Sequence, residues 1–545
     1  MLPFVDQLKP SIILDPRGPW STEQVSGSFL SHAGHPQILP QLIHALNTGH
    51  ITLASLIHAL KRQNLVFGLL IETATELVAV TDHVRSFPIY FSHNQNSLVL
   101  GSSARAVSDK GKSAILSRSA VREYLLSGYV HSNRTLYKDL FSLPAGHILY
   151  FDKRSQVLST NVYFQYLPQG TALGARQQLI RAFGETLDEI FEEIVANAYG
   201  RPIWLPLSGG LDSRLILCKL LEHGAKDITT FTYGNRQNHE IGMAKTISSR
   251  LNVRWLELVS RPRKAQSLYA STVRHEYADY SDGLHMTPVY LDFEAIENLH
   301  SNRRIPSDAI LINGYSGDFL FGGHIPESLA FCPSQDLAVD LFIKKNVSNF
   351  NTQHLLAAQK LVRSRLLSRA RELQKDSSSA ANVTGFYEYL DWSERQTKSV
   401  VNGQRLYEFF GYEWELPLWD RRLLDLWGSI PVHEKLNQML HLRYLKDYNY
   451  RDAFSSLRST NQIWPTRWRW IPAIGALLGL VQGTEQKLQY YEKMFFRSYF
   501  NYQLSLFGKK AYQNWYRSLR TPRVIPLASM TRLEELQIDP EEFLS

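Results

Sequence analysis

The sequence predicts a mixed α/β protein with an antiparallel, layered N-terminal domain and a larger C-terminal domain built on a doubly wound parallel sheet with many helices. Two observations predict this division. Short apolar runs alternate with polar turns before about residue 160, whereas strand and helix patterns alternate from residue 203 to residue 259. A Pro- and Gly-containing stretch at 167–171 separates the two patterns. We therefore place the domains at residues 1–165 and 175–545, the latter mainly helical from about residue 330.

The N-terminal pattern consists of neighbouring short strands. Apolar runs at 65–71 and 76–80 flank a turn-like segment, and runs at 89–92 and 98–101 flank a second polar turn. Closely spaced runs of this kind, rich in β-branched and large apolar residues, are typical of antiparallel sheets.

The C-terminal pattern opens with apolar residues at helical spacing over 178–199. Expected strands then alternate with expected helices: strands at 203–207, 228–233 and 253–259, and helices at 212–223 and 240–251. This alternation predicts a parallel sheet with helices on both faces.

Composition excludes several classes of protein. Hydrophobic residues make up 44% and charged residues 20%, as in globular proteins. The net charge of +8 is spread over 545 residues and predicts no nucleic-acid partner. Two cysteines, Cys218 and Cys332, favour a reducing compartment. The chain shows no signal-peptide pattern, and its apolar run at 471–481 is shorter than the ~20 residues of a spanning helix, so we expect a cytoplasmic protein.

The segment Ser208–Ser213 follows the first expected parallel strand and opens the helix after it. Gly209 and Gly210 let the backbone approach a ligand, and successive N–H groups lie at the positive end of the helix dipole. Such a loop predicts a phosphate site, unless it is only a glycine-rich turn with a serine cap. Asp212 would repel a phosphate unless a divalent cation lay between them, so the loop also predicts Mg²⁺.

The same hexapeptide resembles the signature of the PP-loop ATP-pyrophosphatases, and the chain further resembles asparagine synthetases. Asp82–Tyr90 is similar to the Asp-Arg-x-Gly-x-x-Pro-Leu-Tyr stretch of their glutaminase domain. Gly314–Gly323 resembles their second ATP-site loop, and Pro417–Asp420 resembles their Pro-Phe-Leu-Asp. The resemblance implies an Ntn-type glutaminase fold followed by an ATP-pyrophosphatase synthetase domain.

The resemblance also implies roles for individual residues. Asp212 and Asp318 would bind Mg²⁺, although Asp318 alternatively caps the turn after it. Glu240 would contact AMP, or else only supplies a charge to its helix N-terminus. The implied ATP-binding residues are Leu207, Ser208, Gly209, Gly210, Asp212, Ser213, Tyr233, Gly234, Glu240 and Gly314.

The chain departs from the family at its N-terminus. Asparagine synthetases carry a nucleophilic cysteine directly after the initiator methionine, where this sequence has Leu2 and Pro3. The family's glutamine-holding Asn-Gly-Glu-Ile-Tyr-Asn segment is also missing. Unless the true start lies elsewhere, we expect a degenerate amidotransferase-like domain, with nitrogen supplied as ammonia, by a partner amidase, or as an amine of the substrate.

A second departure is Tyr315, which stands where asparagine synthetases have a glutamate. The β-lactam synthetases have a tyrosine there, paired with a downstream glutamate that Glu413 matches. The resemblance implies that Tyr315 and Glu413 form a catalytic unit. The alternative is that Tyr315 is an aromatic wall and Glu413 a member of an ion pair.

Further segments are similar to asparagine synthetase homologues of bacterial surface-polysaccharide loci, to which amidation of uronic acid sugars is ascribed. They are Glu394–Gln396, Tyr407–Trp414 and His324–Pro326. The aromatic residues around Trp414 and Trp419 suit either a sugar site or a core. Interleaved Trp and Arg at 464–470 suit a buried helix best, with a peripheral membrane contact as an alternative.

These observations favour an ATP-dependent, AMP-forming amide ligase that adenylates a carboxylate and transfers nitrogen to it, with a sugar uronate in surface-polysaccharide synthesis as the expected substrate. One alternative is an intramolecular amide-forming cyclase of the β-lactam synthetase or lasso-peptide kind. A non-catalytic scaffold is a second alternative, against which the intact Ser208–Ser213 loop argues.

Overall fold

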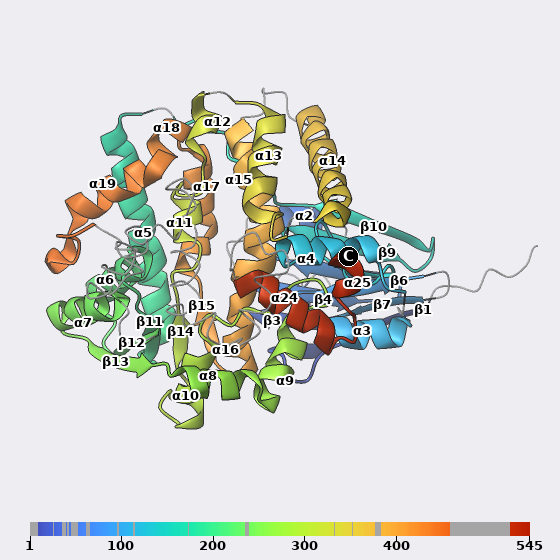
Figure 1. Ribbon diagram of the computed structural model, residues 1–545, viewed down its shortest axis with the longest axis horizontal. Coiled ribbons are helices and arrows are strands. Elements are labelled where there is room, and N and C mark those ends of the chain that lie inside the picture. The colour runs from blue at the N-terminus through green and yellow to red at the C-terminus, as the bar shows by residue number, and fades with distance from the viewer. Residues whose placement is uncertain are drawn as a thin grey trace, which may run out of the picture.

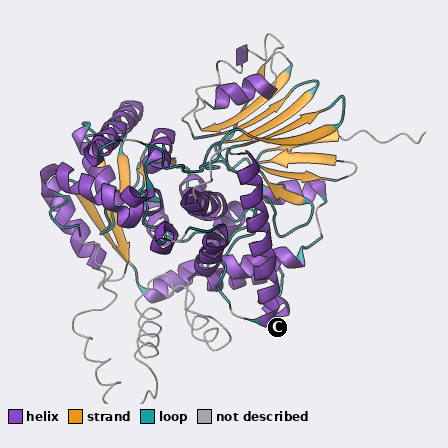
Figure 2. Ribbon diagram, turned by 90° about the horizontal axis from the view of Figure 1, so that it is seen from above, coloured by secondary structure: helices purple, strands orange, loops and turns teal. Residues whose placement is uncertain are grey.

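The computed structural model describes residues 9–457 and 524–544, apart from gaps at 26, 35–39, 41–42, 45–52, 62–65, 95–96, 113–114, 173, 235–238, 332, 351 and 377–382. Figure 1 shows the strands of the N-terminal part at one end of the molecule and the parallel sheet with its helices at the other. Figure 2 shows helices between the two. Of the segments discussed above, Leu2, Pro3, Cys332 and residues 464–481 lie outside the described residues.

The N-terminal part contains two layered sheets. One has six antiparallel strands in the order β10-β9-β5-β4-β3-β2, and the other has four strands in the order β1-β7-β6-β8, with β1 parallel to β7. Their strands are β1 (Lys9–Ile13), β2 (Ser21–Val25), β3 (Ser28–Gly34), β4 (Phe67–Glu72), β5 (Glu76–Thr81), β6 (Tyr90–His93), β7 (Ser97–Gly101), β8 (Leu140–Ser142), β9 (His147–Asp152) and β10 (Val157–Val162).

Strands β4 and β5 are buried on both faces, which explains their nearly continuous apolar sequences. Leu70 and Leu77 pack between the sheets with Phe91 and Leu100 of β6 and β7. The opposite face belongs to the main core together with helix α4 (Arg118–Ser127). The expected hairpins are present, since β4 pairs with β5 and β6 pairs with β7, both antiparallel.

The C-terminal part is built on five parallel strands in the order β13-β12-β11-β14-β15. The strands are β11 (Ile203–Pro206), β12 (Ile228–Gly234), β13 (Arg254–Val259), β14 (Ile310–Ile312) and β15 (Glu413–Glu415). The chain adds strands first on one side of β11 and then on the other, so the order reverses between β11 and β14. In open α/β sheets ligands bind at the carboxyl ends of strands at such a reversal.

Helices surround this sheet and connect it to the N-terminal part. Long helix α5 (Arg176–Ala198) precedes β11, and α6 (Asp212–Glu222) follows the phosphate loop. The other helices are α2 (Leu53–Leu60), α3 (Ala104–Gly111), α7 (His239–Leu251), α8 (Pro262–Tyr269), α9 (Thr272–Ser281), α10 (Phe293–Ser301), α11 (Gly317–Leu320), α12 (Glu327–Phe331), α13 (Gln335–Asn346), α14 (Gln353–Asp376), α15 (Val383–Leu390), α16 (Arg405–Phe409), α17 (Arg421–Ser429), α18 (Val432–Lys435), α19 (Met439–Tyr448), α24 (Val524–Glu535) and α25 (Glu541–Leu544).

Helix α15 continues into a ten-residue π-helix, η1 (Asp391–Val400), and then into the 3₁₀ turn η2 (Val401–Gln404) before α16. Further 3₁₀ turns are η3 (Pro417–Trp419), η4 (Leu436–Gln438) and η5 (Tyr450–Asp452). A π-helix is rare and is found frequently at functional sites. Nothing in the sequence pattern predicts it.

The two parts are bonded to each other at several points. The His83 ring nitrogen Nε2 lies 2.7 Å from the Trp419 carbonyl oxygen, and Trp392 Nε1 donates to the His83 carbonyl. The connecting segment also pairs with the end of α17, because Gln169 N donates to Gly428 O at 2.9 Å. The fold class predicted from the sequence is confirmed, whereas the boundary at residues 165–175 stays a prediction.

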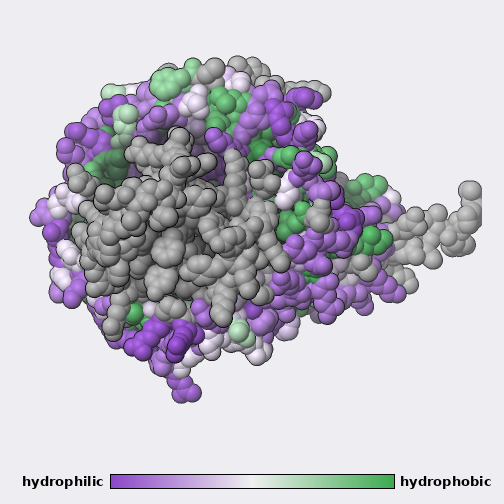
Figure 3. All heavy atoms as spheres, viewed as in Figure 1, coloured by the Kyte–Doolittle hydropathy of each residue, from purple (hydrophilic) through white to green (hydrophobic). Residues whose placement is uncertain are grey.

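One face of the molecule has a mainly polar described surface (Figure 3). On the face shown in Figure 3, hydrophilic residues dominate the coloured surface and hydrophobic patches are smaller. Of the helices described, none has both the length and the apolar character needed to cross a membrane. Cys218 is a free, buried thiol, and burial raises its pKa to about 12.

Candidate active site at the reversal of the parallel sheet

The phosphate loop between β11 and α6 is curled by its own serine hydroxyls. Ser208 Oγ lies 3.1 Å from Ser213 Oγ and accepts a hydrogen bond from Gly210 N at 3.1 Å. Ser208 N donates to Ser213 Oγ at 3.2 Å. These internal hydrogen bonds shape the turn, and residues 208–212 are half-buried.

A buried arginine holds this loop from behind. Arg214 Nη2 donates to the Gly209 carbonyl at 3.1 Å, and Arg214 Nη1 donates to the carbonyls of Ala453 and Ser456 at 3.1 and 3.0 Å. With its guanidinium in the protein interior, Arg214 links the loop to the segment after α19. The sequence motif contains no signal for this anchor, because the carbonyls of Ala453 and Ser456 are more than two hundred residues away.

A second loop, which follows β14, packs directly against the first. A Cβ atom on Gly317 would lie 2.3 Å from Asp212 Cγ, and one on Gly314 would lie 3.0 Å from Ser213 N. Any side chain at Gly317 would therefore displace the Asp212 carboxylate. The structure thus brings the two predicted loops together at the reversal of the sheet, with Asp212 and Asp318 adjacent.

The two carboxylates differ in ionisation. Burial, with a further contribution from the charge of Asp318, raises the pKa of Asp212 to about 7, and a backbone hydrogen bond from Asp318 opposes this shift. Among the described residues no basic side chain bonds Asp212. Asp318 is 60% exposed. A divalent cation between these oxygens would relieve the repulsion, so the donor set fits Mg²⁺.

His324 holds the Asp318 carboxylate in place. Its Nε2 atom lies 3.0 Å from Asp318 Oδ2, and its Nδ1 atom lies 2.7 Å from Asp391 Oδ2. Burial lowers the pKa of His324, but these two bonds outweigh it and the pKa is raised. Partial desolvation also opposes ionisation of the Asp318 carboxylate, yet the bond from His324 leaves its pKa lowered.

The π-helix η1 supplies the outer part of this network. Asp391 is fully buried, and Gln396 Nε2 donates to its Oδ1 atom at 3.2 Å. Ser316 Oγ of the second loop donates to Gln396 Oε1 at 2.7 Å. Lys345 and Arg395 each approach Asp391 to 3.6 Å. The π-helix thus places a carboxylate and an amide against the loop that carries Asp318.

A buried carboxylate, Asp292, accepts hydrogen bonds from three tyrosines. Tyr315 donates to Asp292 Oδ2 at 3.1 Å, Tyr407 donates to the same oxygen at 2.6 Å, and Tyr233 donates to Oδ1. Asp292 is 2% exposed, and burial raises its pKa although the three phenols act in the opposite direction. Tyr233 and Tyr315 are half-buried, whereas Tyr407 lies behind them in the core.

The structure does not bring Tyr315 and Glu413 together. Glu413 is at the amino end of β15, opposite Ile310, whereas Tyr315 follows the carboxyl end of β14. The Glu413 carboxylate is exposed and accepts a hydrogen bond from Arg201 Nη1 at 2.8 Å. Glu413 therefore lies at the amino end of the three-residue strand β15, whereas the two loops lie at the carboxyl ends of the strands.

The remaining predicted residues surround the first loop. Leu207 is buried, and its carbonyl accepts a hydrogen bond from Thr232 Oγ1 at 2.6 Å. Gly234 ends β12 with φ at 143°, a conformation that favours glycine. Glu240 is the second residue of α7, and a Cβ on Gly209 would lie 3.3 Å from its Cα. All three residues therefore lie at the carboxyl edge of the sheet.

The tryptophans for which the sequence left two alternatives belong to the core. Trp419 is 1% exposed and stacks on Phe319, with ring centroids 5.7 Å apart. Trp414 packs on Phe87 of the N-terminal part at 5.7 Å. Neither ring offers an open face on which a sugar could stack.

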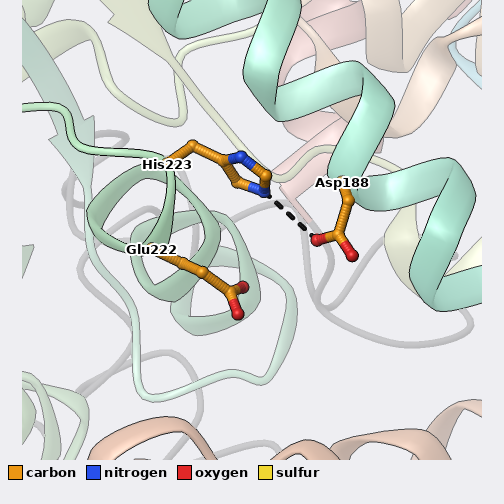
Figure 4. Close-up of side chains that lie close together, drawn as sticks. All are labelled: Asp188, Glu222 and His223. Carbon is orange, nitrogen blue, oxygen red and sulfur yellow. Dashed lines mark hydrogen bonds and ion pairs between the residues drawn. The ribbon is translucent and has the colours of Figure 1, made fainter.

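A second acidic cluster, away from the loops, joins α5 to the end of α6 (Figure 4). Asp188, Glu222 and His223 place ligand atoms within 4.8 Å of one another, as in a metal site. However, the Lys219 ammonium already lies 2.6 Å from Asp188 and 2.8 Å from Glu222. An internal cation thus neutralises this cluster, and we assign no metal to it.

Comparison with known proteins yields two family matches. The asparagine synthase family model matches residues 186–453, and the glutamine amidotransferase domain model matches residues 43–164. A comparison with curated proteins found no match.

Two solved structures show low similarity. An NH3-dependent NAD synthetase from Campylobacter jejuni is 13% identical, with 40% of this chain and 94% of that chain covered and a TM-score of 0.21. A glutamine phosphoribosylpyrophosphate amidotransferase from B. subtilis is 12% identical, with 44% and 72% covered and a TM-score of 0.17.

An amidotransferase domain followed by a synthase domain makes the protein a carbon–nitrogen ligase. The same pair of domains supports membership of an asparagine synthetase-like family. It likewise supports ATP-dependent amidation with nitrogen from glutamine or ammonia.

Proposed function

We propose that this ligase adenylates a carboxylate in the crevice between β11 and β14 and then forms an amide with release of AMP. One observation carries the proposal: two glycine-containing loops meet at the reversal of the parallel sheet, with Asp212 and Asp318 adjacent and no basic side chain bonded to Asp212 among the described residues. A phosphate site with paired carboxylates suits a nucleotide whose charge a divalent cation neutralises.

The residues of the two loops bind different parts of ATP. Ser208, Gly209, Gly210 and Ser213 supply N–H and hydroxyl donors for the phosphates. Asp212 and Asp318 would hold Mg²⁺, which when bound would neutralise charge on the pyrophosphate leaving group. The ribose and base of the nucleotide are bordered by residues next to the loops: Leu207, Tyr233, Gly234, Glu240 and Gly314.

Tyr315 acts in the second step, when nitrogen attacks the acyl adenylate. It follows β14 directly after Gly314, beside the phosphate loop, and its ring is half-buried. Glu413 lies at the other edge of the sheet and takes no part in the reaction.

We further propose a sugar uronate of surface-polysaccharide synthesis as the carboxylate, converted in the cytoplasm. The support is the resemblance of His324 and residues 394–396 to that branch, together with their position around the second loop. A tyrosine at position 315 favours the second candidate, a cyclase that joins a carboxylate and an amine of one molecule.

A screen for pyrophosphate release tests the proposal. The purified full chain is incubated with MgATP, ammonia or glutamine, and a panel of uronates, amino acids and amine-bearing carboxylates. We expect AMP and pyrophosphate to appear in equal amounts, and only with a sugar uronate plus a nitrogen source. Turnover of an amine-bearing carboxylate alone would favour the cyclase, and formation of ADP would overturn the adenylation proposal.

A further inference from the structure

Asp292 occupies a position that normally has a local role. It is the residue before α10, where an aspartate usually accepts a hydrogen bond from the first N–H groups of its own helix. Here the carboxylate makes no such bond. It accepts instead from phenols that come from β12, from the loop after β14 and from α16. The carboxylate therefore bonds side chains of three distant elements rather than backbone N–H groups of its own helix.

The neighbours of Tyr315 leave its ring little freedom. Tyr315 N donates to Asn313 Oδ1 at 3.1 Å, and Asn313 Nδ2 donates to the Tyr407 hydroxyl at 3.3 Å. A Cβ on Gly403 would lie 2.9 Å from Tyr315 Cε2, so the ring edge rests against that glycine. The backbone, the ring and the hydroxyl of Tyr315 are thus each held by a different group.

We propose that Asp292 is the positioning residue of Tyr315, and that it receives the Tyr315 hydroxyl proton when that hydroxyl accepts a proton from the attacking nitrogen. This inference rests on the proposed function. It replaces the motif-based partner, Glu413, with a carboxylate that no motif indicates.

The step balances without a further reactant. The nitrogen lone pair forms the C–N bond, and the C–O bond to AMP breaks with its electron pair staying on AMP. One N–H proton moves to Tyr315 Oη, and the Tyr315 proton moves to Asp292 Oδ2. Asp292 later returns this proton to solvent. The burial that raises the Asp292 pKa makes the carboxylate a better acceptor than an exposed aspartate.

The three tyrosines contact Asp292 from different sides and therefore have different roles. Tyr407 is 1% exposed and bonds the same oxygen as Tyr315, so it fixes Asp292 from the core side. Tyr233 bonds the other oxygen from the end of β12, on the nucleotide side. Of the three, only Tyr315 combines a bond to Oδ2 with a half-buried position after β14. Because of this geometry, Asp292 should influence amide formation more than adenylation.

The test measures the two half-reactions separately in the full chain. Pyrophosphate exchange reports adenylation, and single-turnover amide formation with the carboxylate found in the screen reports acyl transfer. Asp292→Asn should slow amide formation by about 10²–10⁴-fold and leave exchange within about twofold, because proton transfer by a placed group contributes that much. Tyr315→Phe should do the same, and the double variant should be no slower than either alone.

Two further variants keep the test decisive. Glu76→Gln removes the charge from a comparable carboxylate, which accepts a hydrogen bond from Tyr150 in the N-terminal part, and should change neither half-reaction. Asp292→Glu retains the charge if Asp292→Asn fails to fold, and its displaced carboxylate should also slow only amide formation. Equal losses in both half-reactions, additive losses in the double variant, or a normal rate of amide formation in Asp292→Glu would overturn the inference. Absence of exchange in the unmodified chain would instead refute the proposed function.

Discussion

Two acidic clusters near helix α6 show how a binding site differs from a structural one. At its carboxyl end, Asp188 and Glu222 surround the Lys219 ammonium, which is 2% exposed. At its amino end, Asp212 and Asp318 approach each other, no described basic side chain bonds Asp212, and the Asp212 pKa rises to about 7. The first cluster thus has an internal cation between its two carboxylates. Of the two carboxylates in the second cluster, His324 bonds only Asp318, and a bound divalent cation would favour the ionised form of Asp212.

The largest expected effect concerns this second cluster. Asp212→Asn should lower carboxylate-dependent pyrophosphate exchange by at least about 10³-fold, because loss of a metal ligand removes several kcal/mol of charge stabilisation and 1.4 kcal/mol is about tenfold. Asp188→Asn is the matched control and should exchange normally. Equal exchange in the two variants would remove the distinction between the clusters.

The histidines of the two clusters offer the next comparison. His324→Ala should raise the Mg²⁺ concentration needed for half-maximal exchange by about 10–100-fold, as expected when a metal ligand loses the group that orients it. His223→Ala removes a bond to Asp188 and should leave the Mg²⁺ requirement unchanged. A lower maximal rate without any change in Mg²⁺ requirement would contradict the role given to His324.

The Asp212 pKa predicts how stability depends on pH. Unfolded aspartate ionises near pH 3.9, whereas folded Asp212 keeps its proton to about pH 7. The folded state therefore binds more protons in this window, and its free energy of unfolding should fall as the pH rises from about 4 to 7. Denaturant unfolding without metal should show this decline, and Asp212→Asn should lack that contribution. Stabilisation by Mg²⁺ should grow over the same window, and a Mg²⁺ effect equal at pH 5 and pH 8 would contradict it.

The smallest effect is expected at the first cluster. Lys219→Met keeps the buried stem but removes the cation, and should lower the free energy of unfolding by about 1 kcal/mol because both partner carboxylates are partly exposed. Exchange should not change. A loss of exchange with normal stability would show that this cluster also serves the reaction.

Local motifs predicted part of the site, and tertiary packing decided the rest. The Ser208–Ser213 loop could be placed from the sequence because a strand, a glycine-containing turn and a helix are adjacent in the chain, whereas Asp318 was indicated only by the resemblance of Gly314–Gly323 to a family loop. Asp292 could not, since its partners come from three separate elements. Asp391 depends on a π-helix that no periodicity indicated.

Glu413 shows the limit of motif counting. Its sequence separation from Pro417 fits the family pattern. The register of β15 against β14 nevertheless places Glu413 beside Arg201, at the amino ends of the strands. Positions in a motif give the order of residues along the chain. They do not say whether a residue lies at the amino or the carboxyl ends of the strands, and even a short strand runs from one to the other.

Transfer of an oxygen label tests the central claim, that this ligase activates its carboxylate as an acyl adenylate. The carboxylate identified in the screen is enriched in ¹⁸O and converted to the amide with MgATP and a nitrogen source, and the AMP is analysed by mass spectrometry. Adenylation predicts one ¹⁸O atom in AMP for each amide formed. Unlabelled AMP, or label in inorganic phosphate with formation of ADP, would contradict the account.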